Sequence, residues 1–338
     1  MNDFPYAERF PVNRRLPERG RPRADVLAEL HAMAEEEDAF WETGKCSGTM
    51  YSGDHEHYRF LNEAFGLFAH VNVLQRDMCP SATKLEGEII AMALDLMHAE
   101  AVEDTTPGGL VTSGGTDSIL HAMLAYREHA ARERGIDGST GRPNIVKPET
   151  AHPAFDKAAR LLGLELRVVP VTGDTTVDPQ AMAEQIDERT IGIIGSAGNY
   201  GYGTVDPIAE LGRLAMARGV PLHVDGCLGG FILPFGEELG YDVPPFDFRV
   251  PGVASISADT TSTATRSRAP RHCCSATGRS ATRSTSSWRA GAAASTCRRA
   301  SRGRGPVVCW RPPGRRWCST AGRGTSSTPA RSSPPPRR

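Results

Sequence analysis

Alternating strand-like and helical segments fill the middle of the chain and restrict its fold more than any other feature. Short apolar runs alternate with segments whose apolar residues recur every three or four positions. The predicted strands are residues 144–146, 166–171, 191–195, 222–225 and 253–257, and the predicted helices are residues 155–162, 179–186 and 207–217. This alternation is typical of a mostly parallel sheet covered by helices on both faces, so we predict an α/β fold.

The segments before this region are mixed. Apolar residues at helical spacing predict a short helix over residues 25–38 and a longer helix that begins at a Ser81 cap. Residues 1–24 are rich in Pro and Arg and predict an extended arm. Glycines between residues 41 and 54 predict a loop.

The composition changes abruptly at Thr261. Residues 261–338 contain 17 Arg but no Asp, Glu, Lys, Leu, Ile, Phe, Tyr or Met. Such a segment cannot bury enough apolar surface to offset its chain entropy, so we predict a disordered basic tail. All 40 acidic residues but only 22 of the 39 basic residues precede it, so the net charge of −1 conceals an acidic body. The predicted organisation is an N-terminal arm and short helix at 1–40, a large domain at 41–260, and this tail.

Cysteine usage and hydropathy suggest a cellular location. The body contains three widely spaced cysteines, Cys46, Cys79 and Cys227, which favours a reducing compartment over a disulfide framework. No run approaches the roughly 18 apolar residues of a membrane span, and the N-terminus lacks the apolar core of a signal peptide. We expect a cytoplasmic protein with no transmembrane segment and no metal site. A basic tail can bind nucleic acid, but we expect no such partner.

Residues 221–231 contain the most informative strand. An apolar run ends in Asp225 and is followed by small residues, which predicts a buried strand that delivers one carboxylate to a cleft. The alternative is an ordinary aspartate that caps a turn at the end of the strand.

Residues 112–118 form the second motif, Thr-Ser-Gly-Gly-Thr-Asp-Ser, at the start of a predicted helix. Glycines expose backbone N–H groups, and the positive end of the helix attracts an anion, so this turn suits a phosphate. It lacks the Gly-Lys-Ser/Thr of a Walker motif. A small-residue turn before a helix is also common without a ligand.

Together these motifs resemble the pyridoxal-phosphate (PLP) enzymes of the group II decarboxylase family, most closely its sphingosine-1-phosphate lyase branch. The resemblance rests on His-Val-Asp at 223–225, Ser-Ala-Asp-Thr at 257–260, the run 112–118 and the run 150–157. It covers roughly residues 40–260 and implies the large domain of a fold-type I PLP enzyme, here incomplete.

The resemblance implies a role for each matching residue at the cofactor. Asp225 would pair with the pyridine nitrogen and keep it protonated, so that the ring accepts electrons. His152 would stack on the ring, although a histidine before a proline is more often a plain helix-entry residue. Cys227, beside Asp225, would be a small core residue and not a nucleophile. The phosphate cradle would consist of Ser113, Gly114, Gly115 and Thr116.

Three further residues resemble those that shape the lyase site. Tyr200 would act as a general acid or base or position the substrate, and His70 and Tyr51 would line the cavity, some of these residues reaching across a dimer interface. Two departures affect this comparison. Family members usually have prolines at the positions of Gly198 and Gly201, and Pro-Leu-His where residues 73–75 are Val-Leu-Gln. The alternative for His70 and Tyr51 is ordinary packing.

The lysine that would form the Schiff base with PLP is missing. In the family, the second strand runs into Ser-x-Asp-Thr-His-Lys, but no lysine follows Thr260 here. One base inserted after the Thr260 codon, with permitted codons, changes the next six residues to His-Lys-Tyr-Gly-Tyr-Ala and completes the motif. The same shift turns residues 267–276 into an apolar strand and residues 309–318 into a plausible core helix. We therefore predict that the tail is the right gene read in the wrong frame.

The resemblance implies a carbon–carbon lyase. An intact homodimeric relative would cleave a phosphorylated long-chain amino alcohol by a retro-aldol reaction to a fatty aldehyde and phosphoethanolamine. An amino-acid decarboxylase on the same scaffold is the alternative, because Asp225, His152 and the cradle serve both reactions. A third interpretation is a truncated, non-catalytic product. We predict that the chain as written is inactive, because the lysine is absent.

Overall fold

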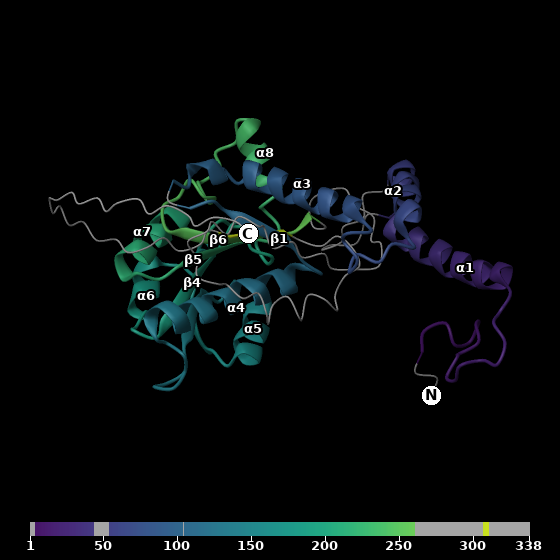
Figure 1. The fold of residues 1–338 in the computed structure, drawn as a ribbon, viewed down its shortest axis with the longest axis horizontal. Helices are drawn as coiled ribbons and strands as arrows, with labels where there is room; N and C mark the ends of the chain where they lie inside the picture. The colour runs from purple at the N-terminus through teal and green to yellow at the C-terminus, as the bar shows by residue number, and fades with distance from the viewer. Residues whose placement is uncertain (1–3, 44–53, 104, 261–306, 311–338) are drawn as a thin grey trace, which may run out of the picture.

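A computed structural model describes residues 4–43, 54–103, 105–260 and 307–310 (Figure 1). Within these residues, one seven-stranded sheet has the order β1-β7-β6-β5-β4-β2-β3. The strands are β1 (Gly108–Val111), β2 (Asn144–Pro148), β3 (Glu165–Val169), β4 (Thr190–Ser196), β5 (Leu222–Gly226), β6 (Val253–Ala258) and β7 (Val307–Trp310). Strands β2 to β6 pair in parallel, and β7 is antiparallel to both β1 and β6. The predicted α/β class is confirmed.

The helices of the described residues cover the sheet or extend beyond it. They are α1 (Arg23–Trp41), α2 (His55–Phe68), α3 (Pro80–Leu96), α4 (Gly115–Arg134), α5 (Ala154–Leu162), α6 (Pro179–Glu184), α7 (Ile208–Arg218) and α8 (Leu233–Glu238). Figure 1 shows α3 above the sheet, α4 and α5 below it, and α1 projecting away from it. In the described part of the chain, no helix is both long and apolar enough to cross a membrane.

Two hydrophobic cores lie on opposite faces of the sheet. In one core, Ile193, Val224 and Leu211 pack with residues of α3, α6 and α7. In the other, Ile145 and Ile194 pack with residues of α4 and α5. Strands buried on both faces need continuous apolar runs, which explains the pattern in the sequence. Both layers of helices expected from the alternation are therefore present.

The N-terminal elements differ in part from prediction. The expected helix at 25–38 is α1, which is longer at both ends. The predicted Ser81 cap is wrong, because Pro80 occupies the first turn of α3 and Cys79 is the N-cap. Proline suits this position because its missing N–H is not needed there. Helix α2 was not predicted at all. The expected loop at 41–54 lies largely outside the described residues.

Strand β7 lies inside the segment that the sequence predicted to be disordered. Residues 307–310 are Val-Val-Cys-Trp, an apolar and β-favouring run that pairs with β1 on one side and β6 on the other. The prediction of disorder therefore fails for these four residues. The remainder of residues 261–338 lies outside the described residues.

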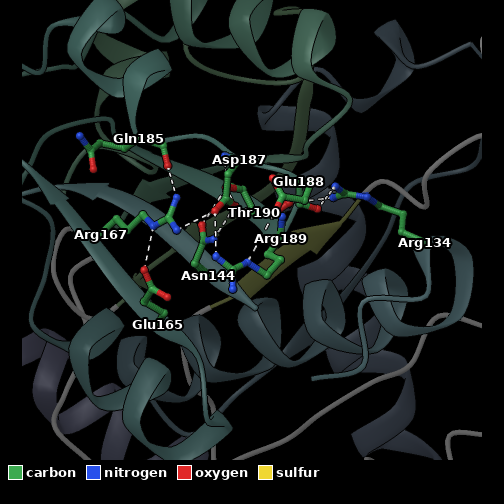
Figure 2. A network of polar contacts seen from close by, with 9 residues as sticks. All are labelled: Arg134, Asn144, Glu165, Arg167, Gln185, Asp187, Glu188, Arg189 and Thr190. Atoms are coloured by element: carbon green, nitrogen blue, oxygen red, sulfur yellow. Dashed lines mark hydrogen bonds and ion pairs between the residues drawn. The ribbon is translucent and has the colours of Figure 1, made fainter. Parts of the chain in front are cut away.

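A polar network connects the starting ends of β2, β3 and β4 (Figure 2). The carboxylate of Asp187 accepts hydrogen bonds from Asn144 Nδ2 and Arg167 Nη2, at 2.8 Å and 2.7 Å. Burial raises the pKa of Asp187, but these hydrogen bonds outweigh burial and lower it overall. The network therefore fixes the register of these strands, at the end of the sheet opposite the candidate site.

Candidate cofactor-binding site

The candidate residues gather where the strands end. Residues 113–115 follow β1, His152 follows β2, Tyr200 follows β4, and Asp225 lies at the end of β5. In open parallel sheets, ligands bind in the crevice beyond the carboxyl ends of the strands, where the strand order reverses. The fold therefore brings four separate sequence motifs together at the carboxyl ends of the strands, which form one edge of the sheet.

Asp225 is buried at the centre of this edge, with 4% of its surface exposed. Its Oδ1 accepts a hydrogen bond from the Cys227 backbone N–H at 3.0 Å and another from the Ser257 hydroxyl at 3.3 Å. Burial raises the pKa of Asp225 to about 6, and the nearby charge of Asp259 contributes in the same direction. Among the described residues, both hydrogen bonds end on Oδ1 and none is found on Oδ2.

The first turn of α4 forms the candidate phosphate cradle. Gly114 is the N-cap, and the Asp117 carboxylate accepts hydrogen bonds from the Ser113 backbone N–H and hydroxyl at 3.1 Å and 3.0 Å. Burial raises the pKa of Asp117, but hydrogen bonds from His121 and Ser113 outweigh it and lower the pKa overall. Thr116 is half-buried in the same turn. The turn is thus fixed by its own side chains.

Gly115 lies against the segment that follows β5. A Cβ atom at Gly115 would lie 3.7 Å from Cys227 Sγ and 3.9 Å from Asp259 Oδ2. The backbone of the cradle therefore approaches the end of β5 closely, which places an anion-binding helix terminus beside the buried acid. Cys227 separates the two as a small, half-buried residue.

His152 is fixed by its own loop. Its Nδ1 accepts a hydrogen bond from the Ala154 backbone N–H at 3.1 Å, so the neutral ring carries its proton on Nε2. Burial lowers the pKa of His152, and the positive charge of Lys147 lowers it further. The ring meets the Tyr200 ring edge to face, with centroids 5.1 Å apart and planes at 71°.

Lys147 was not singled out from the sequence. It is 4% exposed at the end of β2 and forms a 2.8 Å ion pair with Asp156 on α5. Its Nζ also donates a hydrogen bond to the Ala151 carbonyl at 3.2 Å. Lys147 thus contacts the chain both before His152, at Ala151, and after it, at Asp156. The signal in the sequence was a lysine directly after two apolar residues, Ile145 and Val146, of the predicted strand.

The loop that carries Tyr200 is held by Asn199. The Asn199 side chain donates to Thr204 Oγ1 at 2.6 Å and accepts from the Tyr202 backbone N–H at 2.8 Å. Gly198 has φ +77°, and a Cβ there would lie 3.0 Å from the Gly229 backbone nitrogen. Proline cannot adopt this φ, so the loop differs from one with a proline at this position. Tyr200 itself is 53% exposed.

Of the two remaining candidates, the structure describes only His70. Tyr51 lies outside the described residues. His70 is exposed on the turn after α2 and, within the described chain, has no hydrogen bond or ring contact with β5, α4 or α5. The structure thus groups the proposed cofactor residues with Tyr200 and leaves His70 apart from them.

These groups match the polar ends of PLP. A buried carboxylate suits the pyridine nitrogen, a helix N-terminus suits the phosphate, and an imidazole beside them suits the ring face. The full sequence provides no lysine after Thr260. The described residues contain no group of three His, Cys, Asp or Glu that suits a metal ion.

Comparisons with known proteins identify the family. The model of the pyridoxal-dependent decarboxylase conserved domain matches residues 6–263. The chain belongs to this family. The resemblance found from the motifs is therefore confirmed, and PLP is the cofactor that this family uses.

Similar proteins include several sphingosine-1-phosphate lyases. The chain is 44% identical to the Arabidopsis thaliana lyase over 66% of this chain and 41% of that protein. The structure of the Burkholderia pseudomallei lyase is 47% identical, with a TM-score of 0.77, and the match covers 91% of this chain and 63% of that one. A probable L-aspartate decarboxylase of Pyrococcus furiosus is 38% identical over 72% of this chain and 62% of its own length. The chain thus spans less than two thirds of each of these relatives.

Proposed function

We propose that this chain is the cofactor-binding part of a PLP-dependent carbon–carbon lyase of the sphingosine-1-phosphate type. One observation carries the proposal. Cys227 links the two candidate groups: its backbone N–H donates to the buried Asp225 carboxylate at 3.0 Å, and its Sγ would lie 3.7 Å from a Cβ at Gly115 in the helix terminus. Identities of 44% and 47% to two such lyases favour this reaction class.

Each residue has a distinct task in this proposal. When bound, PLP supplies an electron-accepting ring for the pair released by the breaking bond. Asp225 holds the proton on the ring nitrogen, and the backbone N–H groups at 114–115 bind the phosphate. His152 covers one face of the ring and excludes water from it. Tyr200 presents its hydroxyl at the exposed side, where a substrate proton can be taken or returned.

An amino-acid decarboxylase is the second candidate, supported by the 38% identity to the probable L-aspartate decarboxylase. Asp225, His152 and the cradle serve both reactions equally, because the two differ only in which Cα bond is broken. A direct comparison of substrates distinguishes them. A frame-restored protein should release aldehyde from a phosphorylated sphingoid base and no carbon dioxide from L-aspartate or L-glutamate. The reverse result would establish the decarboxylase.

We also propose that the chain as written is frameshifted after Thr260 and therefore inactive. The family match ends at residue 263, three residues beyond the proposed shift. Resequencing the codons for residues 258–268 tests the shift directly. One additional base restores the lysine, and its absence excludes a sequencing error. In an assay, the written chain should show no turnover and the restored chain should be active, while the restored chain with alanine at the new lysine should be inactive.

We further propose a homodimer that works in the cytoplasm. Helix α2 contains no buried residue, although Phe60, Phe65, Leu67 and Phe68 are all large and apolar. An apolar face of this kind on a monomer marks an association surface. Light scattering should give twice the monomer mass, and substituting Phe60 and Phe65 with Ser should give a monomer.

The free cysteines support the proposed cytoplasmic location. Neither Cys79 nor Cys227 forms a disulfide, which fits a reducing compartment.

A further inference from the structure

A chain of buried hydrogen bonds leads from α4 to Asp225. The Tyr126 hydroxyl lies 2.6 Å from Ser255 Oγ, and Ser255 Oγ lies 2.7 Å from His223 Nδ1. His223 Nε2 lies 3.2 Å from Ser257 Oγ, which donates to Asp225 Oδ1 at 3.3 Å. All five residues are at most 4% exposed. Buried polar groups in an apolar core must be satisfied by one another, so this chain behaves as a unit.

A register shift between β5 and β6 assembles the chain. Leu222 pairs with Val253, but the next residue, His223, pairs with Ser255, so Ala254 is the extra residue of an irregularity. Two residues later, Asp225 pairs with Ser257. Without the extra residue, neither serine would lie opposite His223 or Asp225. Irregularities of this type re-aim side chains beside functional sites.

The direction of every hydrogen bond follows from one of them. Because the Ser257 hydroxyl donates its proton to Asp225, its oxygen must accept from His223, so Nε2 carries the imidazole proton. Nδ1 of the neutral ring then accepts from Ser255, whose oxygen in turn accepts from the Tyr126 hydroxyl. Each donor therefore points toward the carboxylate.

The surroundings keep the imidazole neutral and fixed. Complete burial lowers the pKa of His223 to about 3. The Tyr126 and Phe155 rings meet it edge to face, with centroids 6.4 Å and 5.8 Å away. Phe155 lies in the first turn of α5, three residues after His152.

We propose that His223 is a positioning residue for Asp225 and acts through Ser257. The aligned donors hold Oδ1 and stabilise the ionised carboxylate against burial, which leaves Oδ2 for the nitrogen of a bound heterocycle. Only the statement that Oδ2 is left for a cofactor nitrogen rests on the proposed function. Asp259 is the titratable group whose charge acts on the Asp225 carboxylate, and it raises the pKa of that carboxylate.

The first test needs no substitution. Nitrogen-15 NMR of the ligand-free full chain, labelled at histidine, should show His223 as the neutral Nε2–H form from pH 7 to pH 8, where the Asp225 carboxylate is ionised. A resonance of the Nδ1–H form, or of a charged imidazolium in this range, would overturn the proposal, because either state reverses or breaks the direction of the chain.

The second test removes single links. Ser257→Ala should raise the pKa of Asp225 by about one to two units, a tenfold to hundredfold change in its ionisation equilibrium, because the ionised form loses a donor. Carbon-13 NMR of labelled aspartate follows this titration, and Asp225→Asn assigns the signal. Ser257→Thr keeps the hydroxyl and should restore the original value. Tyr126→Phe should give a smaller rise in the same direction.

Ser118→Ala is the matched control. Ser118 is equally buried and forms a 2.7 Å hydrogen bond with Thr112 Oγ1, but it has no place in the chain that leads to Asp225. The pKa of Asp225 should not change in this variant. Equal shifts in Ser118→Ala and Ser257→Ala, or no shift in Ser257→Ala, would reduce His223 to a packing role.

Both tests use protein without cofactor, so they separate the inference from the proposed function. PLP affinity is measured independently by equilibrium dialysis. If the chain fails to bind PLP but Ser257→Ala still raises the pKa of Asp225, the proposed function is wrong and the positioning role of His223 stands. If the chain binds PLP but Ser257→Ala leaves this pKa unchanged, the positioning role is wrong and the proposed function stands.

Discussion

The rings of His152 and Tyr200 meet edge to face, with their centroids 5.1 Å apart. They come from different loops, after β2 and after β4, and the contact joins the residue proposed to cover the cofactor to the residue proposed to move a proton. Tyr200 is otherwise half exposed, so this contact is its main support.

Removing the Tyr200 ring should weaken cofactor binding by leaving His152 without support. Tyr200→Ala should lower the affinity for PLP about threefold to tenfold, in line with the worth of one aromatic pair. Tyr200→Phe keeps the ring and should bind PLP like the unmodified chain. In a frame-restored enzyme, Tyr200→Phe should lower kcat about 100-fold or more if the hydroxyl moves a proton. Equal affinity in the Ala variant would show that His152 needs no support.

Asp225→Asn should stabilise the ligand-free protein while weakening PLP binding. The pKa of Asp225 rises from 3.8 to about 6 on folding, so the folded state holds the proton more tightly than the unfolded state. Stability is therefore lost as the pH rises from about 4 to about 6, reaching about 3 kcal/mol above that range. Urea denaturation should show a gain for Asn at pH 7 that shrinks toward pH 4. A gain independent of pH would contradict this assignment.

Two glycines on the Tyr200 loop offer a matched pair of substitutions. Gly198 and Gly203 have φ of +77° and +75°, but only at Gly198 would a Cβ meet neighbouring backbone, at Gly229. Gly203→Ala should cost about 1 kcal/mol for the backbone conformation alone. Gly198→Ala should cost about 1 to 2 kcal/mol more because of the contact. Equal losses in the free energy of unfolding of the two variants would show that the backbone at Gly229 moves to accommodate the added Cβ.

Deleting the tail should loosen β1. In the described structure, the strand that pairs with β1 is β7, so a chain ending at Thr260 removes this strand pairing. Hydrogen exchange should show lower protection at Leu110, while the amides of β4 and β5 stay protected. A chain ending at Trp310 retains β7 and is the control. Unchanged protection after the longer deletion would mean that other contacts hold β1.

Strands β2 to β6 and the helices between them up to α7 followed from the sequence because both faces of the sheet are buried, and burial imposes a clear apolar period. Strand β1 and helix α8 were not predicted. The acid Asp225 and the cradle followed from short motifs. Helix α2 was not predicted, and none of its residues is buried, so it contributes nothing to the two cores.

The hydrogen-bond chain to Asp225 could not be predicted from the sequence. It depends on the extra residue Ala254, which decides whether Ser255 or its neighbour lies opposite His223. A shift of the pairing by one residue moves every side chain of a strand to the other face of the sheet. Nothing in the sequence of residues 253–257 indicates that such a shift occurs. Tyr126 lies 129 positions from Ser255, so the first link depends on tertiary packing alone.

The pairing of Gly108 with Trp310 also fixes the order of events during synthesis. Strand β1 leaves the ribosome roughly 200 residues before its partner, and closing so long a loop carries a large entropy cost. The parallel strands β2 to β6 can assemble first, with α4 packed against them, while β1 waits for β7. An arrest of translation anywhere between Thr260 and Val307 would therefore produce a chain whose buried acid is in place while β1, which leads into the anion cradle, still lacks its partner strand β7.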